Sequence, residues 1–303
     1  MGGDLLVRGA VALARRLRVP PVAVAATVVA FGTSLPELVV SIHAALTGHP
    51  ALILGNVVGS NIANVLVVGG VTAIVHPLMH DDPAVRRNAT LMVAGLIGFA
   101  VLTAVEGMSR AAGVILLVAF ALVMAQTLRT TVRGPKDVDV ETPLDLVLGI
   151  PSRLGTITLF IVAGIVMLPL GAQLLVDSAV HIAERFAVPE TVIGLTVLAI
   201  GTSLPELTTT VVAAIERRAD VAIGAIIGSN MFNVLAIMGV TATLSPVPIP
   251  VSPRLVWLDL PVMLLTGALF GYFAWAARPI GRVMGMVLLL AYVAYLGTLS
   301  VIV

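Results

Sequence analysis

The stretch GTSLPEL at residues 32–38 decides how this chain folds, because the same seven letters return at residues 201–207. Both copies lie inside long apolar stretches. Proline and glutamate are unusual in a membrane-crossing helix, where a carboxylate costs about 2.5–3.5 kcal/mol. Their recurrence in one arrangement indicates a duplicated functional element rather than an accident of packing.

The composition is that of an integral membrane protein. Of 303 residues, 59% are hydrophobic and 11% are charged, whereas a soluble domain has about 25% charged residues. The mean hydropathy is +1.10. No ten-residue segments alternate with period two, so helices are favoured over a β-barrel. Since a span needs about 20 apolar residues, the sequence predicts ten helices, at roughly 4–17, 21–47, 51–75, 88–105, 111–129, 154–183, 190–215, 220–243, 255–276 and 282–302.

The repeat extends well beyond the seven residues. Adding 169 to each position of 32–73 reaches 201–242 without a gap, and 20 of these 42 pairs are identical. Five predicted crossings separate each element from its copy, and an odd number places the copy in the opposite orientation. We therefore expect an all-α polytopic membrane protein of two inverted five-helix repeats, residues 1–130 and 154–303, joined by a cytoplasmic linker at 131–153.

The basic residues indicate the orientation in the membrane, because cytoplasmic loops are enriched in Lys and Arg. With the N-terminus outside, three face outward: Arg110, Arg185 and Arg254. Thirteen face the cytoplasm: Arg15, Arg16, Arg18, Arg86, Arg87, Arg129, Arg133, Lys136, Arg153, Arg217, Arg218, Arg278 and Arg282. We expect both termini outside. Sixteen arginines to one lysine favour a microbial chain in the cytoplasmic (inner) membrane.

The first helix is expected to be short. Gly171 aligns with Gly2 in the repeat, so the apolar segment 156–170 has no counterpart in the first half. Either the first helix is short in the native protein or Met1 lies downstream of the native start, and we favour the second interpretation.

The motif brings oxygen atoms to the middle of the second and seventh predicted helices. Pro36 cannot donate a hydrogen bond to the carbonyl of Gly32, and Pro205 similarly frees that of Gly201. Unpaired carbonyls at membrane depth must meet protein, water or an ion.

Hydroxyl and amide side chains follow the same spacing. Thr33 lies four residues before Glu37, on one helical face, and Ser60–Asn64 and Ser229–Asn233 repeat this spacing in the third and eighth helices. Oxygen ligands without Cys or His suit hard cations such as Ca²⁺ and Na⁺. Buried Ser and Thr often only bond back to a helical carbonyl, but recurrence of the whole set favours an ion site.

At this point the residues resemble a known family. GTSLPEL followed by GNVVGSNIAN, and GTSLPEL followed by GAIIGSNMFN, are similar to the paired α-repeats of the sodium/calcium exchangers, in the cation/calcium antiporter superfamily. The resemblance implies that the second, third, seventh and eighth helices form an ion-binding core, across which the long first and sixth helices slide. The loop at 130–153 is too short for the regulatory domains of animal exchangers, so the microbial type is implied.

The resemblance also implies individual roles. Glu37 and Glu206 would be carboxylates shared by Ca²⁺ and Na⁺, and Thr33 and Thr202 would add Ca²⁺ ligands. The Na⁺ sites would be completed by Ser34, Ser60, Ser203 and Ser229 with the carbonyls of Ala30 and Ala199, and Asn64 and Asn233 would line the centre. Asn233 replaces the Asp of several relatives, which argues against K⁺ cotransport. Asn56 need not be a ligand, because its repeat partner is Ala225.

We therefore expect a secondary antiporter that exchanges Na⁺ for Ca²⁺ at one alternating site, acting as a monomer in the lipid bilayer with no cofactor and no nucleic-acid partner. A proton-coupled Ca²⁺ or divalent-cation exchanger using the same glutamates is the alternative. A channel would lack counter-ion dependence. An intramembrane enzyme is disfavoured because the sequence has no Cys, no His-Glu-x-x-His and no midmembrane Asp dyad.

Overall fold

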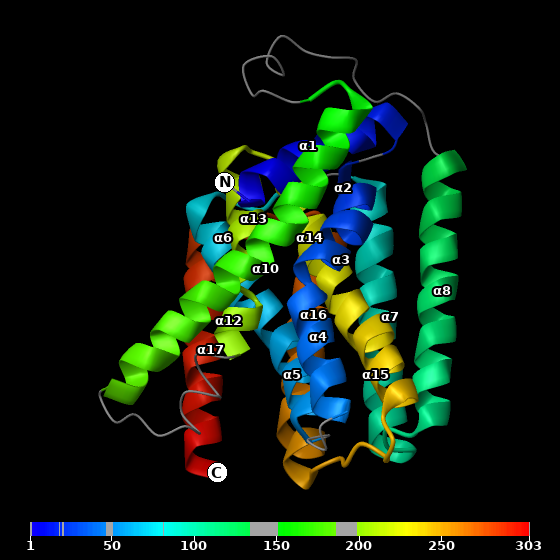
Figure 1. The fold of residues 1–303 in the computed structure, drawn as a ribbon, viewed down its shortest axis with the longest axis vertical. Helices are drawn as coiled ribbons and strands as arrows, with labels where there is room; N and C mark the ends of the chain where they lie inside the picture. Colours follow the sequence, from blue (N-terminus) through cyan, green and yellow to red (C-terminus); the bar gives the residue numbers. More distant parts are fainter. Residues whose placement is uncertain are drawn as a thin grey trace.

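The computed structural model describes residues 2–17, 19, 21–46, 51–80, 82–133, 151–185 and 199–302. Within these ranges the chain is helical between short connections (Figure 1), and π-helical segments are labelled η. The first half contains α1 (Gly2–Leu17), α2 (Pro21–Val24), η1 (Ala25–Val29), α3 (Ala30–Thr33), α4 (Leu35–Leu46), α5 (Ala51–Ala63), η2 (Asn64–Gly69), α6 (Gly70–Val75), α7 (Pro83–Val105) and α8 (Arg110–Arg133). The second contains α10 (Leu154–Arg185), α12 (Ala199–Thr202), α13 (Leu204–Ile215), α14 (Ala219–Met231), η4 (Phe232–Ile237), α15 (Met238–Leu244), η5 (Leu255–Asp259), α16 (Leu260–Trp275) and α17 (Arg282–Ile302).

The helices match the predicted membrane spans. Six helical stretches in the described residues are long and apolar enough to cross a bilayer alone: Ile53–Val75, Pro83–Val105, Arg110–Thr127, Ala219–Leu244, Leu255–Trp275 and Arg282–Leu299. The bent pair Ala25–Thr33 and Leu35–Leu46 makes a seventh, and Leu154–Leu168 and Leu204–Ile215 are shorter apolar helices. Part of the predicted span 190–215 and most of the linker 131–153 lie outside the described residues.

The second predicted helix is broken rather than continuous. α3 ends at Thr33 and α4 begins at Leu35, with Ser34 outside helical geometry (φ −87°, ψ 9°) and a bend of 51° between the two parts. Ser203 repeats this geometry before α13 (φ −86°, ψ 5°). The reason is proline, which suits the first turn of a helix because its missing N–H is not needed there.

Among the described spans, the most buried are the two that carry the Gly-Ser-Asn segments at 59–61 and 228–230. In the most apolar 18-residue stretch of Ala219–Leu244 every residue is buried, and in that of Ile53–Val75 78% of the residues are buried. The corresponding share is only 22% in α8 and in α17. The stretches α5–η2–α6 and α14–η4–α15 therefore form the centre, and α8 and α17 lie at the periphery (Figure 1).

Two isolated β-bridges show the inverted repeat in the connections. Leu78 pairs with Ile280, and Met108 pairs with Ile249. The first pair joins the connections after α6 and α16; the second joins those after α15 and α7, the repeat counterparts. Each bridge therefore pairs a connection of one repeat with a connection of the other, as expected for two related halves of one fold.

Glycine crossings repeat the same symmetry. α6 packs against α17 at Gly70 and Gly285, where a Cβ on Gly285 would lie 2.6 Å from the Gly70 carbonyl oxygen. α15 packs against α8 at Gly239 and Gly113, where a Cβ on Gly113 would lie 2.9 Å from the Gly239 carbonyl oxygen. Small residues allow such close approach between membrane helices.

The long helix α10 crosses the front of the bundle at a slant (Figure 1) and packs along α1. Gly9 and Gly164 allow this contact: a Cβ on Gly164 would lie 2.7 Å from the Leu6 Cβ, and a Cβ on Gly9 would lie 2.8 Å from Ile161. The two helices form one layer over the core.

Candidate functional site

Two carboxylates from different repeats are buried at the centre of the core. Glu37 and Glu206 are 1% and 2% exposed, and each occupies the first turn of the helix that starts after a break. The positive end of a helix favours an anion at that position. The two carboxyl groups interact electrostatically, so the inverted repeat brings them together as predicted.

Among the described residues, the helices that carry the predicted site residues have no Lys or Arg to neutralise these charges. The sequence has no Lys or Arg in 21–46, 51–75, 199–215 or 219–244. Both carboxylate oxygens of Glu37, and Oε2 of Glu206, are buried without a hydrogen-bond partner. Buried charges need a partner, and a cation or a proton can supply it.

Ser34 links the two repeats directly. Its hydroxyl donates to Oε1 of Glu206 at 2.9 Å, although 172 residues separate them. Thr33 and Ser229 also lie beside the Glu206 carboxyl. The site is therefore shared between the halves rather than built twice.

Half-helices end at the site on both sides. The carbonyl of Ala30 accepts from the Ser34 N–H at 3.1 Å and from the Thr33 hydroxyl at 3.3 Å, so Thr33 makes the ordinary back-bond in this structure. α12 begins at Ala199, whose side chain lies outside the described residues, and ends at Thr202, which is buried. Helix C-termini carry partial negative charge, which favours a cation nearby.

The Ser and Asn residues of the third and eighth predicted helices are also buried. Ser60 and Ser229 are buried. Ser203, at the break before α13 in the seventh predicted helix, is also buried, and its hydroxyl has no hydrogen-bond partner among the described residues. Asn64 opens η2 and Asn233 is the second residue of η4, and neither amide has a partner. π-helical turns are frequent at functional sites. η2 packs against α13, and η4 packs against α4, so each Asn-bearing segment lies against the Glu-bearing helix of the other repeat.

Gly228 determines how closely the helices approach beside Ser229. A Cβ at this position would lie 2.6 Å from both the Cα and the carbonyl oxygen of Ala26. The side chain of Ile165 in α10 similarly occupies the space where Gly32 would carry a Cβ. The first glycine of the motif is therefore a packing contact with the slanted helix.

Asn56 supports the site rather than lining it. Its Nδ2 donates to the Ser41 hydroxyl at 2.9 Å and to the Glu37 carbonyl at 3.2 Å, which ties α5 to the helix that carries Glu37. Sequence reasoning set Asn56 aside as a ligand but missed this role. The sequence signal that could have indicated this role is the position of Asn56, a polar residue one turn before the Gly-Ser-Asn segment in an apolar helix.

Thr210 and Thr72 form a second support that sequence reasoning missed. The Thr210 hydroxyl donates to the Glu206 carbonyl at 2.9 Å and accepts from Thr72 at 2.9 Å. The bond joins α6 to α13 and braces the turn that carries Glu206. Periodicity does not indicate this pair, because 138 residues separate its members.

The donor set suits a transported cation better than a resident metal. Within the described residues no group of three or more His, Cys, Asp or Glu side chains is placed to hold a metal. Two carboxylates among hydroxyl, amide and carbonyl oxygens offer hard ligands with few charges.

Comparisons with known proteins agree with this geometry. The family model described as sodium/calcium exchanger protein matches residues 1–128 and 156–301. The chain belongs to the sodium/calcium exchanger family. As a member, it is a multi-pass membrane transporter and not an enzyme.

The alignments to individual relatives extend over nearly the whole of this chain and of each relative. The sodium/calcium exchanger MaX1 of Methanosarcina acetivorans is 30% identical, over 97% of this chain and 93% of that protein. The inner membrane protein YrbG of Escherichia coli is 33% identical, over 98% of this chain and 91% of that protein. A solved structure of the sodium-calcium exchanger NCX_Mj, soaked with Na⁺ and Ca²⁺, matches with a TM-score of 0.84 and 30% identity, covering 98% and 93% of the two chains. The predicted ten-helix inverted-repeat fold is confirmed.

Proposed function

We propose that this protein is a secondary antiporter that moves Na⁺ and Ca²⁺ in opposite directions through one alternating site. The observation that carries the proposal is the pair Glu37 and Glu206, buried together from opposite repeats without a Lys or Arg partner among the described residues. Two carboxylates balance one Ca²⁺ or two Na⁺, so the ions compete for the same charge. MaX1 is named a sodium/calcium exchanger, which supports the same ion pair here.

The individual roles follow the ligand chemistry. Glu37 and Glu206 bind both ions, and Thr33 and Thr202 add oxygens for Ca²⁺. Asn64 and Asn233 line the centre, and as neutral amides they add no charge to that of the two glutamates. Oxygens for Na⁺ come from Ser34, Ser60, Ser203, Ser229 and the carbonyls of Ala30 and Ala199.

Alternating access uses the layer formed by α1 and α10. α10 contacts the motif directly at Gly32 through Ile165, and α1 packs against α13. Sliding of this layer exposes the site to one side of the membrane and then to the other. The core, braced by Asn56 and Thr210, keeps its shape.

The proposed organisation follows the repeat. Residues 1–130 and 154–303 are the two inverted halves, 131–153 is the cytoplasmic linker, and both termini lie outside. One chain supplies both carboxylates, so a monomer is sufficient for exchange. The protein resides in the cytoplasmic membrane of a microbial cell; the relative YrbG is named an inner membrane protein.

Proton coupling is the second candidate. The same unpartnered carboxylates that attract Na⁺ can each bind a proton, so a Ca²⁺/H⁺ or divalent-cation/H⁺ exchanger fits the same residues. The two candidates differ only in which gradient drives Ca²⁺ movement.

A flux experiment separates them. Proteoliposomes loaded with radiolabelled Ca²⁺ are diluted into Na⁺ buffer, or into Na⁺-free buffer with a pH gradient. We expect release with Na⁺, loss of release in Glu206→Gln, and retained release in the control Glu216→Gln, ten residues along the chain and outside the core. Release driven by the pH gradient alone would select the proton-coupled exchanger. Unchanged flux in Glu206→Gln would refute the site.

A further inference from the structure

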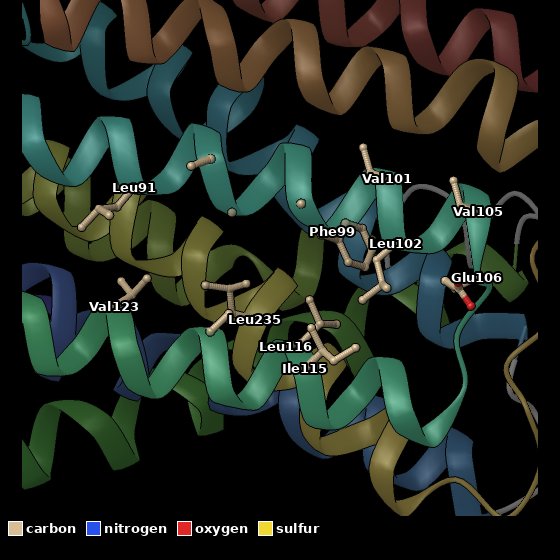
Figure 2. A pocket seen from close by; sticks show the side chains of 14 residues that line it. Leu91, Phe99, Val101, Leu102, Val105, Glu106, Ile115, Leu116, Val123 and Leu235 are labelled. Atoms are coloured by element: carbon tan, nitrogen blue, oxygen red, sulfur yellow. The ribbon is translucent and has the colours of Figure 1, made fainter.

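A lateral groove lies between α7 and α8. Its volume is about 620 Å³, within the roughly 300–1,000 Å³ of pockets that enclose small ligands. Figure 2 shows side chains from both helices along it, from Leu91 and Val123 at one end to Val105 and Glu106 at the other. Leu235 of η4 lies between them as part of the floor.

The groove opens toward the membrane and closes toward the core. Its rim residues Val101, Val105 and Ile115 are exposed, whereas Phe99 and Leu235 are buried. Both walls are membrane-spanning helices, so the surroundings of the opening are lipid chains. An apolar hollow in contact with lipid gains dispersion contacts when a chain fills it.

The hollow exists because one face of α7 carries small residues. A Cβ on Gly98 would meet nothing within 4 Å, and one on Gly95 would make only ordinary contact with Leu235 at 3.5 Å. Ala94 also lines the groove. Between Leu91 and Val105 it runs for about 21 Å at 1.5 Å per residue. One leaflet contributes roughly half of the 30 Å hydrocarbon core, so one acyl chain fits lengthwise.

Charge is confined to one end. Glu106, the residue after α7, is the single ionisable side chain among the described residues that line the groove, and it is exposed. Nearby, Arg110 at the start of α8 donates from Nε to the Ser245 carbonyl at 3.2 Å, so it is held at this end of the bundle. A carboxylate with a neighbouring guanidinium matches a headgroup that carries both an ammonium and a phosphate.

We propose that the groove between α7 and α8 is a binding site for one phospholipid of the phosphatidylethanolamine class, with an acyl chain in the groove and its ammonium at Glu106. Because Leu235 lies two residues after Asn233 in η4, the bound chain contacts the segment that carries a residue of the ion site. The lipid therefore braces η4 from the membrane side. This site is separate from the ion site and does not depend on which ions are exchanged.

Native mass spectrometry of the full chain in mild detergent tests the proposal. We expect the wild type to retain one phospholipid, and to prefer phosphatidylethanolamine over phosphatidylglycerol with identical chains by about fivefold, the effect of one charge near the membrane surface. Gly98→Phe fills the groove and is expected to lower retention by roughly tenfold, because the ring and an acyl chain together would overfill the same space. Glu106→Gln is expected to abolish the headgroup preference while leaving chain binding.

The matched control is Ile97→Phe, which adds a ring one residue away at a half-exposed position that does not line the groove. It is expected to retain lipid like the wild type. Ala94→Leu adds a smaller side chain to the groove and replaces Gly98→Phe as the test variant if Gly98→Phe does not fold. Equal retention in the filled and control variants, or detergent alone bound to the wild type, would overturn the site. An unchanged preference in Glu106→Gln would overturn the headgroup assignment.

Discussion

Replacing Gly285 by alanine tests the glycine crossing that holds α17 against the core. The added Cβ would lie 2.6 Å from the Gly70 carbonyl oxygen and 2.9 Å from Cγ1 of Ile74. A carbon and a carbonyl oxygen in contact need about 3.3–3.6 Å, so α17 must withdraw by roughly 0.7–1 Å. The nearest atom belongs to the backbone, so no rotamer change relieves the overlap.

The expected cost is that of overpacking, about 1–3 kcal/mol. For a chain of this size it corresponds to a melting temperature lower by roughly 2–6 °C. Gly297→Ala on the same helix is the matched control, since a Cβ there meets nothing within 4 Å. Alanine is favoured over glycine in a helix by up to about 1 kcal/mol, so the control is expected to melt at or above the wild type.

The measurement is thermal unfolding of the two purified variants in one detergent, followed by intrinsic fluorescence or by loss of the monodisperse peak. Because Gly70 directly follows η2, which begins at Asn64, withdrawal of α17 is also expected to weaken stabilisation by Ca²⁺. If Gly285→Ala melts at or above Gly297→Ala, the close crossing is not a constraint and the packing argument fails.

Three further predictions concern polar contacts outside the lipid groove. Asn56→Ala removes the bonds to Ser41 and the Glu37 carbonyl and is expected to cost about 1–2 kcal/mol, seen as a lower melting temperature; an unchanged value would show that α4 and α5 hold together without this clamp. Burial raises the pKa of the Glu216 carboxyl above 4.5, although Arg8 opposes the shift. The protonated carboxyl therefore stabilises the folded protein fully below pH 4.5, and this stabilisation is lost as the pH rises through the raised pKa. Glu216→Gln should therefore gain stability relative to the wild type as the pH rises from about 4.5 to 7, and parallel melting curves across that range would contradict it. Tyr295→Phe leaves Oδ1 of the buried Asp259 without its hydroxyl donor at 2.8 Å, at an expected cost of about 1.5–3 kcal/mol; denaturant or thermal midpoints equal to wild type would argue against it.

Hydropathy and the repeat were sufficient to predict the architecture. Apolar stretches of bilayer length must form helices, because lipid offers no partner for backbone N–H and C=O groups. The offset of 169 between the two GTSLPEL copies then predicted both the inversion and the convergence of Glu37 with Glu206. Each of these inferences needs only local composition or a one-dimensional spacing.

The tertiary structure decided what the helices do where they meet. The sequence placed Pro36 inside one continuous helix, but the structure ends α3 and starts α4 around Ser34, since the neighbouring half-helices can accommodate the 51° bend. The bond from Ser34 to Glu206, the Asn56 clamp and the π-helical turns at Asn64 and Asn233 were likewise not predictable from spacing.

By itself, then, the sequence determined that this protein is a duplicated membrane transporter with a charged centre, because burial and periodicity act on each helix separately. Only the tertiary structure decided which oxygens face one another and where α7 and α8 part to leave a groove. The facing oxygens depend on contacts between residues more than a hundred positions apart, such as Ser34 with Glu206. The groove depends on side-chain volume, because Gly98 has no side chain to fill it. Helical periodicity carries no information about either.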